Sequence, residues 1–177
     1  MKPVFIAIAM LACAVQPALA QTNNPPAQRS DAPDPVIQYS DQDAAMNAAI
    51  ADARRTLPQF LAEFDAAPAS QRSAFSVKVG LPADGGGEEH IWVTDLRREG
   101  GQLVGALANG PHRLQGMRRG SRVVIDEALI SDWSINAREG LYGAYTTRVM
   151  LPQLDADTAA QLREMLSPAP TPAWWTS

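Results

Sequence analysis

The sequence predicts an α+β domain in which a curved, mainly antiparallel β-sheet packs against two N-terminal helices and one C-terminal helix. Three changes of pattern along the chain support this fold class. Apolar residues recur at helical spacing from Met46 to Phe64, alternate with a period of two from Phe75, and return to helical spacing after Asp155. Helices followed by strands and then by a helix are typical of an α+β fold.

The first twenty residues have the pattern of a secretory signal peptide. Lys2 gives a basic start, Val4 to Val15 form an apolar run, and Ala18-Leu19-Ala20 provides the small side chains that a signal peptidase reads. The run is shorter than the ~20 apolar residues that a bilayer span needs, so no transmembrane segment is expected in the mature chain. We expect cleavage after Ala20 and a mature protein that is periplasmic or secreted.

An alternative N-terminus would carry a lipid. Met10-Leu11-Ala12-Cys13 resembles the processing box of a bacterial lipoprotein, which would leave an acylated, membrane-anchored Cys13. The apolar run continues past Cys13 and ends in the Ala-x-Ala site, which favours soluble export. Cys13 is the single cysteine of the chain, so cleavage after Ala20 leaves a domain that folds without a disulfide.

Residues 21–38 are rich in Pro, Asn and Asp and predict a disordered tether ahead of the domain. One α+β domain is expected over residues 39–167, which is an ordinary domain size, and a Pro/Trp tail over residues 168–177. Loss of Lys2 with the signal peptide changes the formal net charge from −4 to −5. This charge argues against a nucleic-acid partner bound through general electrostatics.

The two N-terminal helices are expected over residues 41–55 and 58–65. Ser40 and Asp43 form a start that resembles a capping box, in which side-chain oxygens accept from free backbone N–H groups. Pro58 lacks the N–H group that the carbonyl oxygen of Arg54 would accept from. The first helix is therefore expected to end before Pro58, and the second to carry it in its first turn.

Strands are expected next, over residues 75–81, 88–96, 102–108, 121–126 and 141–151. Residues 128–133 fit neither period, and a last helix is expected from its cap, Asp155, to Leu166. The residues expected to share the core are Phe75, Val77 and Val79 of the first strand with Ile50, Leu57 and Phe60 of the helices.

The common motifs of catalysis and cofactor binding are absent from the sequence. It contains no Gly-rich phosphate loop, no Gly-x-Ser-x-Gly elbow and no paired-cysteine metal site. The two histidines are His90 and His112. No cofactor and no metal ion are therefore expected, and no residue is assigned a catalytic role.

Glu88, His90 and Trp92 form a polar and aromatic group on one face of the second strand, because alternate strand residues point the same way. A carboxylate two residues from an imidazole orients the ring and raises its pKa, as a general base requires. The structural alternative is that His90 bonds to a neighbour and Trp92 serves only in packing.

Two further elements complete the set of candidate binding residues. Asn109 begins a segment that is either a structural turn or a ligand-binding loop. Asp132 directly precedes Trp133, whose large side chain is suited to anchoring a core. If the chain binds a ligand or partner, we expect His90, Trp92, Asn109, Asp132 and Trp133 to converge on one concave surface. The structural alternative places Trp92 and Trp133 in the core.

The order of these pieces resembles the YegJ-like family of bacterial proteins of unknown function. The resemblance spans about residues 41–151 and rests on Met46-Asn47, Ala49-Ile50, Ala53-Arg54, Thr56-Leu57, Phe60, Phe75, Lys78, Glu89-His90-Ile91-Trp92, Gly105, Leu107-Ala108-Asn109, Pro111, Ile130-Ser131-Asp132-Trp133, Gly143, Tyr145-Thr146 and Arg148. The chain departs from the family pattern at Gly110 and Ser121, where an acidic residue is usual. The resemblance implies a shared fold and ancestry but no activity.

We expect a non-enzymatic, exported binding or interaction module with an unknown protein or small-molecule partner. The alternative is a small periplasmic hydrolase or transferase that uses His90 with a carboxylate and Arg148 to hold an anion. The aromatic pair Trp174 and Trp175 either folds back over the domain or stays exposed for a partner.

Overall fold

The computed structural model describes residues 3–7, 36–40 and 43–176. Most of the predicted signal peptide and tether, with Cys13 and the cleavage position, lies outside these residues. The strands are β1 (Pro3–Ala7), β2 (Val36–Ser40), β3 (Phe75–Pro82), β4 (Glu88–Glu99), β5 (Gln102–Leu107), β6 (Arg122–Ile125), β7 (Ile130–Ala137) and β8 (Gly140–Gly143). The α-helices are α1 (Ala44–Ala66), α2 (Tyr145–Met150) and α3 (Ala156–Met165), and the 3-10 turns are η1 (Ala69–Ala74), η2 (Glu127–Leu129), η3 (Leu151–Gln153) and η4 (Ala173–Thr176).

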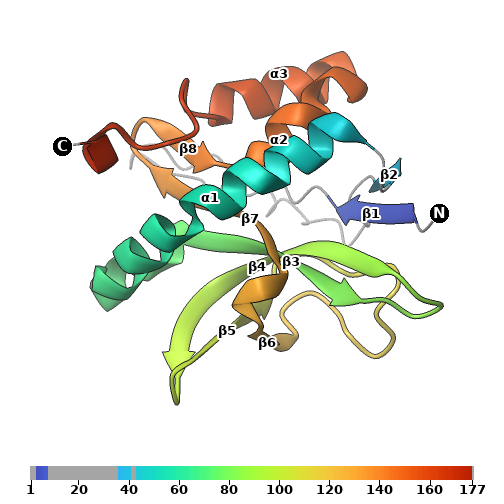
Figure 1. Cartoon of the computed structure of the whole chain (residues 1–177), viewed down its shortest axis with the longest axis horizontal. Coiled ribbons are helices and arrows are strands. Elements are labelled where there is room, and N and C mark those ends of the chain that lie inside the picture. Colours follow the sequence, from blue (N-terminus) through green and yellow to red (C-terminus); the bar gives the residue numbers. More distant parts are fainter. Residues whose placement is uncertain (1–2, 8–35, 41–42, 177) are drawn as a thin grey trace, which may run out of the picture.

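Strands β3 to β8 form an open antiparallel sheet in the order β6-β5-β4-β3-β7-β8. The antiparallel pair β1–β2 joins this sheet through β1, which runs parallel to β4. Shifts of register between Lys78 and Val79 and between Thr94 and Arg97 mark bulges, which bend the strands. The predicted α+β class with a curved, mainly antiparallel sheet is therefore confirmed (Figure 1).

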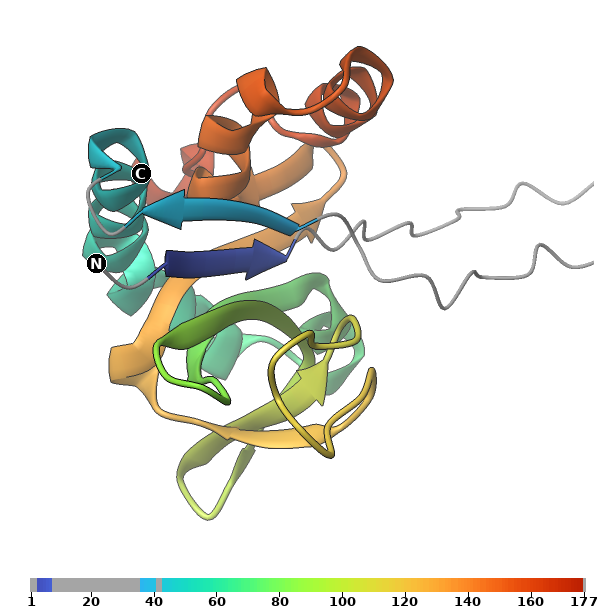
Figure 2. The ribbon, with the colours of Figure 1, turned by 90° about the vertical axis from the view of Figure 1, so that its right-hand side faces the viewer.

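Helix α1 packs against β7 and α2 and covers one face of the sheet. Figure 2 shows α2 and α3 gathered at one end of the molecule, with strands β3 to β6 at the other. The core between α1 and the sheet includes Leu57, Phe60, Phe75, Val77 and Val79, as predicted. Ile50 is half-buried and packs instead against a second cluster around Met150. Among the described helices, none is both long and apolar enough to cross a bilayer.

Helix α1 is continuous over Ala44–Ala66, so the expected break before Pro58 is wrong. A proline inside a helix costs about 3 kcal/mol, because it removes a hydrogen bond and crowds the preceding turn. The face that carries Ala53, Leu57 and Phe60 is buried on both sides of Pro58. Each large apolar side chain buried there contributes about 1.5–3 kcal/mol, so burial of one continuous stripe outweighs the cost of the proline.

Of the three residues that the sequence predicted as part of a helix cap, Asp43 and Asp155 have this role and Ser40 does not. The Asp43 side chain accepts a hydrogen bond from the backbone N of Met46 at 2.9 Å and is the N-cap of α1. Ser40, the other residue of the predicted capping box, ends β2 instead. Asp155 caps α3 as predicted, accepting from the backbone N of Thr158 at 2.9 Å.

The chain reverses where the sequence predicted a strand over residues 141–151. Strand β8 ends at Gly143 and α2 follows, because Gly143 and Ala144 have left-handed φ angles of 70° and 51°. A Cβ atom on Gly143 would lie 2.2 Å from the carbonyl oxygen of Trp133, so this turn requires glycine. Residues 128–133, which fitted neither period, complete η2 and begin β7.

The C-terminal tail folds back on the domain. Trp174 Nε1 donates to Glu63 Oε1 at 3.0 Å, and Trp175 Nε1 donates to the other oxygen of the same carboxylate. The centre of the Trp175 ring lies 5.1 Å from that of Trp133. Of the two arrangements considered for these aromatics, the tail therefore adopts the docked one.

Truncation of Val77 tests the assignment of the sheet faces. Val77 is 0% exposed, so Val77→Ala should lower the free energy of unfolding by about 1–3 kcal/mol, measured by urea denaturation. Val124 on β6 is 47% exposed, and Val124→Ala is the matched control, with an expected change below about 0.5 kcal/mol. Equal effects of the two substitutions would contradict the assignment.

Candidate functional site

The sheet face that points away from α1 carries a row of buried side chains. Lys78 lies opposite Trp92 of β4 and opposite Asp132 of β7, so these three side chains share this face. His90 pairs with Gly80, two residues along β3, and lies on the same face. Lys78, His90, Trp92 and Asp132, here called the polar row, are each 7% exposed or less. Groups this deeply buried are stable only with hydrogen-bond or charge partners.

The Asp132 carboxylate is the most highly bonded member of the polar row. Its Oδ1 accepts from the backbone N of Trp133 at 2.8 Å and of Tyr145 at 3.2 Å. Its Oδ2 accepts from the backbone N of Thr146 at 2.8 Å and from Thr146 Oγ1 at 2.6 Å. The carboxylate therefore caps the first turn of α2 and connects it to β7. Burial raises the pKa of Asp132, while Lys78 and these hydrogen bonds oppose the rise.

Lys78 supplies the positive charge of the polar row. Its Nζ donates to Thr146 Oγ1 at 2.7 Å, and that hydroxyl donates to Asp132, so the two charges are linked through one threonine. The ammonium nitrogen also lies 4.9 Å from the centre of the Trp92 ring, a favourable cation–π distance. Burial lowers the pKa of Lys78 to about 8, and the charge of Asp132 opposes this shift. Lys78 therefore remains mainly protonated at neutral pH.

His90 lies between two hydrogen-bonding side chains. Its Nδ1 is 2.8 Å from Ser131 Oγ, and this hydroxyl is 3.3 Å from the carbonyl oxygen of Lys78. Its Nε2 is 3.5 Å from Glu88 Oε2. Burial, followed by the positive charges of Lys78 and Arg54, lowers the pKa of His90 to about 4. The imidazole is therefore neutral at physiological pH.

A pocket opens beside the polar row, between the sheet and the C-terminal helices. The residues that line it are Ser76, Trp92, Thr94, Ala108, Ser134, Leu141, Thr147, Leu162, Met165 and Leu166. The space in and above it that no atom fills is about 490 Å³, and this figure includes the part open to solvent. Ser76 is 3% exposed, and its hydroxyl has no hydrogen-bond partner in the described part of the chain.

Three of the five residues expected at a binding surface lie on this face: His90, Trp92 and Asp132. Trp133 does not join them, because consecutive residues of a strand point to opposite faces of the sheet. Asn109 follows β5 and is 7% exposed. Neither its amide nitrogen nor its amide oxygen is hydrogen-bonded within the residues described. The structure thus brings three of the five residues together, places Trp133 on the opposite face and leaves Asn109 beyond the end of β5.

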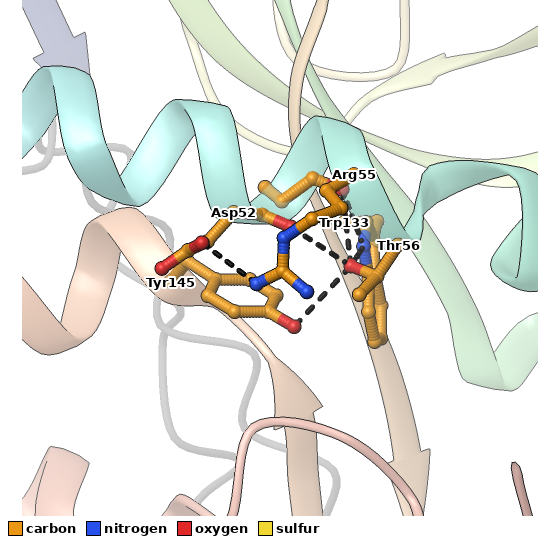
Figure 3. Close-up of polar contacts among 6 residues, drawn as sticks. Asp52, Arg55, Thr56, Trp133 and Tyr145 are labelled. Atoms are coloured by element: carbon orange, nitrogen blue, oxygen red, sulfur yellow. Dashed lines mark hydrogen bonds and ion pairs between the residues drawn. The ribbon is translucent and has the colours of Figure 1, made fainter. Parts of the chain in front are cut away.

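Trp133 anchors α1 to the sheet. Its ring stacks on Phe60 with the ring centres 5.3 Å apart. Figure 3 shows its indole nitrogen against α1, where it donates to the carbonyl oxygen of Ala53 at 3.1 Å and to Thr56 Oγ1 at 3.0 Å. Thr56 Oγ1 in turn lies 3.2 Å from the Tyr145 hydroxyl. Trp133 therefore has the structural role that the core alternative assigned to it.

Sequence reasoning missed Ser76, Lys78 and Thr146 as site residues. Ser76 and Lys78 alternate with Val77 in the predicted strand, so the period already placed them away from the first core. What the pattern did not reveal is that α2 and α3 cover this second face as well. Among the described residues, no group of three His, Cys, Asp or Glu side chains is placed to hold a metal ion.

Comparison with known proteins gives one matching family model, described as an uncharacterized protein conserved in bacteria (DUF2314), over residues 43–166. The chain is 28% identical over 137 residues to the uncharacterized protein YegJ of Escherichia coli, covering 77% of this chain and 87% of that protein. This match confirms the resemblance seen in the sequence. The residues matched by the family model include the polar row and the pocket.

A second relative is a putative ankyrin repeat protein of Neisseria meningitidis serogroup B. It is 34% identical over 128 residues, a match that covers 68% of this chain and 51% of that protein. The chain therefore spans about half the length of this relative. No solved structure matches the chain.

The buried position of His90 makes a prediction about stability in acid. Its pKa is about 4 in the folded state and ordinarily 6.5, so the unfolded chain takes up the proton first as the pH falls. The free energy of unfolding should therefore be highest above pH 6.5 and should fall, by about 3 kcal/mol in total, as the pH is lowered from 6.5 to 4.

Comparison of two substitutions isolates this effect. His90→Gln should flatten the loss of stability between pH 6.5 and pH 4, measured by urea unfolding across that interval. His112 is exposed, so His112→Gln is the matched control and should keep the acid dependence of the wild type. The same acid dependence in His90→Gln and in the wild type would show that burial of His90 does not cause it.

Proposed function

We propose that this chain, which belongs to the DUF2314 family of uncharacterized proteins conserved in bacteria, is an exported, non-enzymatic module that binds a small molecule in the pocket beside the polar row. One observation carries the proposal: the Ser76 hydroxyl is buried in the pocket wall without a hydrogen-bond partner among the described residues. Leaving a buried hydroxyl unpaired costs about 1–3 kcal/mol, and native structures contain few such groups. A ligand that bonds to Ser76 would remove this cost.

The framework of the pocket also favours binding. Ser76, Trp92 and Ser134 lie on three neighbouring strands, β3, β4 and β7, and keep their relative positions through the sheet hydrogen bonds. Leu162 and Met165 face them from α3, whose start is capped by a side chain. Sites on strands and helices hold their shape better than sites on loops, which lowers the entropy lost when a ligand binds.

A hydrolase or transferase that uses His90 has less support. Glu88, His90 and Ser131 lie in a line that resembles an acid–base–nucleophile relay, with contacts of 3.5 Å and 2.8 Å. Ser131, however, is 0% exposed, and its hydroxyl bonds to the carbonyl oxygen of Lys78, so a substrate has no access to it. With a pKa of about 4, His90 is also a weak base at neutral pH.

Arg148, which was expected to hold an anion in such an enzyme, is bonded to the main chain. Its guanidinium donates to the carbonyl oxygens of Gly143 at 2.9 Å, Ser167 at 2.9 Å and Leu141 at 3.2 Å. These contacts join α2 to β8 and to the segment after α3. The geometry therefore suits a structural clamp rather than an anion site.

Export is the second part of the proposal, and it rests on the basic start, the apolar run and the Ala-x-Ala site of the N-terminus. Cleavage after Ala20 would remove β1 from the sheet. The pocket residues all lie between Ser76 and Leu166, so the binding site belongs wholly to the mature chain.

Export predicts the N-terminus of the protein isolated from a bacterial host. Edman sequencing or intact-mass analysis of periplasmic material should find Gln21 as the first residue, because the small side chains at Ala18 and Ala20 direct cleavage there. Ala20→Gln is expected to block processing, whereas Asn24→Gln, outside both the apolar run and the cleavage site, is the control. An intact Met1 on cytosolic protein would contradict export, and an acylated Cys13 would identify the lipoprotein alternative.

Binding predicts that a small molecule accompanies the protein through purification. Ala108 lies half-buried at the pocket, so Ala108→Phe should fill the space, and its organic extract should lack a compound that mass spectrometry finds in the wild-type extract. Ala137 is also half-buried but packs against the first core and does not line the pocket, so Ala137→Phe is the matched control. Identical extracts from wild type and Ala108→Phe would contradict the proposal.

A further inference from the structure

The pocket has two chemically distinct walls. The apolar wall consists of Ala108, Leu141, Leu162, Met165 and Leu166. The polar wall consists of four hydroxyl-bearing residues and one indole: Ser76, Thr94, Ser134, Thr147 and Trp92. None of the lining residues is charged. Such a surface matches a ligand with an apolar body and a neutral hydrogen-bonding group.

Lys78 and Asp132, the two charged residues of the polar row, already have partners within the protein. The Lys78 ammonium bonds to Thr146 and lies against the Trp92 ring, and the Asp132 carboxylate accepts four hydrogen bonds from protein donors. Neither residue lines the pocket. A carboxylate or ammonium group entering the pocket would lose its hydration without meeting a free opposite charge, which is costly.

The polar wall offers one group that needs a partner. The Ser76 hydroxyl is buried and unpaired within the described part of the chain. An uncharged oxygen atom satisfies it, since a hydroxyl or carbonyl oxygen accepts a hydrogen bond from an O–H donor. Met165 on the opposite wall is flexible and adapts to an apolar body of irregular shape.

We infer that the pocket selects an uncharged molecule with an apolar body and a hydroxyl or carbonyl oxygen. The oxygen binds at Ser76, and the apolar body packs against Leu162, Met165 and their neighbours. The inference rests on the proposed function, because it names the ligand class of the same pocket. Although this face of the sheet contains a buried ammonium and a buried carboxylate, every residue that lines the pocket is uncharged.

Three probes with the same eight-carbon chain test the selectivity: 1-octanol, octanoate and octylammonium. The chain has four tryptophans, so the indole N–H region of a ¹H–¹⁵N NMR spectrum is simple, and Trp92→Phe assigns the signal of Trp92. Titration with 1-octanol should shift the Trp92 signal to saturation and leave the signal of the half-exposed Trp174 unchanged. The two charged probes should bind at least about tenfold more weakly, because their charge is not neutralised.

Two serines provide matched variants for the position of the oxygen atom. Ser76→Ala removes an unpaired hydroxyl, so it should weaken 1-octanol binding by about five- to tenfold without lowering the melting temperature. Ser131→Ala removes a hydroxyl that is bonded to His90 and Lys78, so it should lower the melting temperature and leave the affinity for 1-octanol unchanged.

The outcomes separate the two proposals. Failure of all three probes to shift the Trp92 signal would overturn the binding function itself. Octanoate or octylammonium binding as tightly as 1-octanol would overturn the neutral ligand class and leave a binding pocket in place. Unchanged 1-octanol affinity in Ser76→Ala would overturn the placement of the oxygen atom.

Discussion

The buried Asp132 carboxylate determines how the C-terminal half of the domain is arranged. Asp132 has no exposure to water, so its carboxylate loses its hydration, which costs on the order of several kcal/mol for a buried ion. Hydrogen-bond donors of the protein must replace the lost water. The required donors include the backbone N–H groups of Tyr145 and Thr146, which are available only if β8 stops and the chain begins a helix. The reversal at Gly143, the position of α2 and the link from Thr146 to Lys78 therefore depend on one side chain of β7.

The residue after Asp132 supports the other face in the same way. The Trp133 indole is held by the carbonyl oxygen of Ala53 and by Thr56, which fixes α1 over the sheet, and its ring contacts Trp175 of the tail. Gly143 has room only for a hydrogen atom beside Trp133, so the turn that satisfies Asp132 also fits closely against the anchor of the first core. Two adjacent residues of β7 thus couple the packing of both faces, and a disturbance of either side chain reaches the pocket through α2.

Strands β3 to β6 and the last helix were predictable because each buries one periodic apolar stripe, as Phe75 and Val77 show on β3. Strand β7 was not predicted, because residues 128–133 were not assigned to an element. The end of β8 was not, because the signal for it is a hydrogen bond from Tyr145 to a carboxylate thirteen residues earlier in the chain. The continuity of α1 through Pro58 depends on burial against β7, which a local pattern does not contain. The candidate site was predicted in part: alternation places His90, Trp92 and Asp132 together, whereas Ser76 becomes a site residue only because α3 covers it.

Membership of the family implies a shared structural framework, but it does not identify a ligand. Lys78, Asp132, Trp133, Gly143 and Thr146, on which the family resemblance partly rests, are buried in the network that holds the sheet, α1 and α2 together. The family match over residues 43–166 covers α3 and the pocket walls as well as this framework. A shared fold does not by itself imply a shared ligand, because function depends on the chemistry of the site. The ligand class inferred for this chain therefore rests on its own pocket wall, which is apolar on one side, hydroxyl-bearing on the other and uncharged throughout.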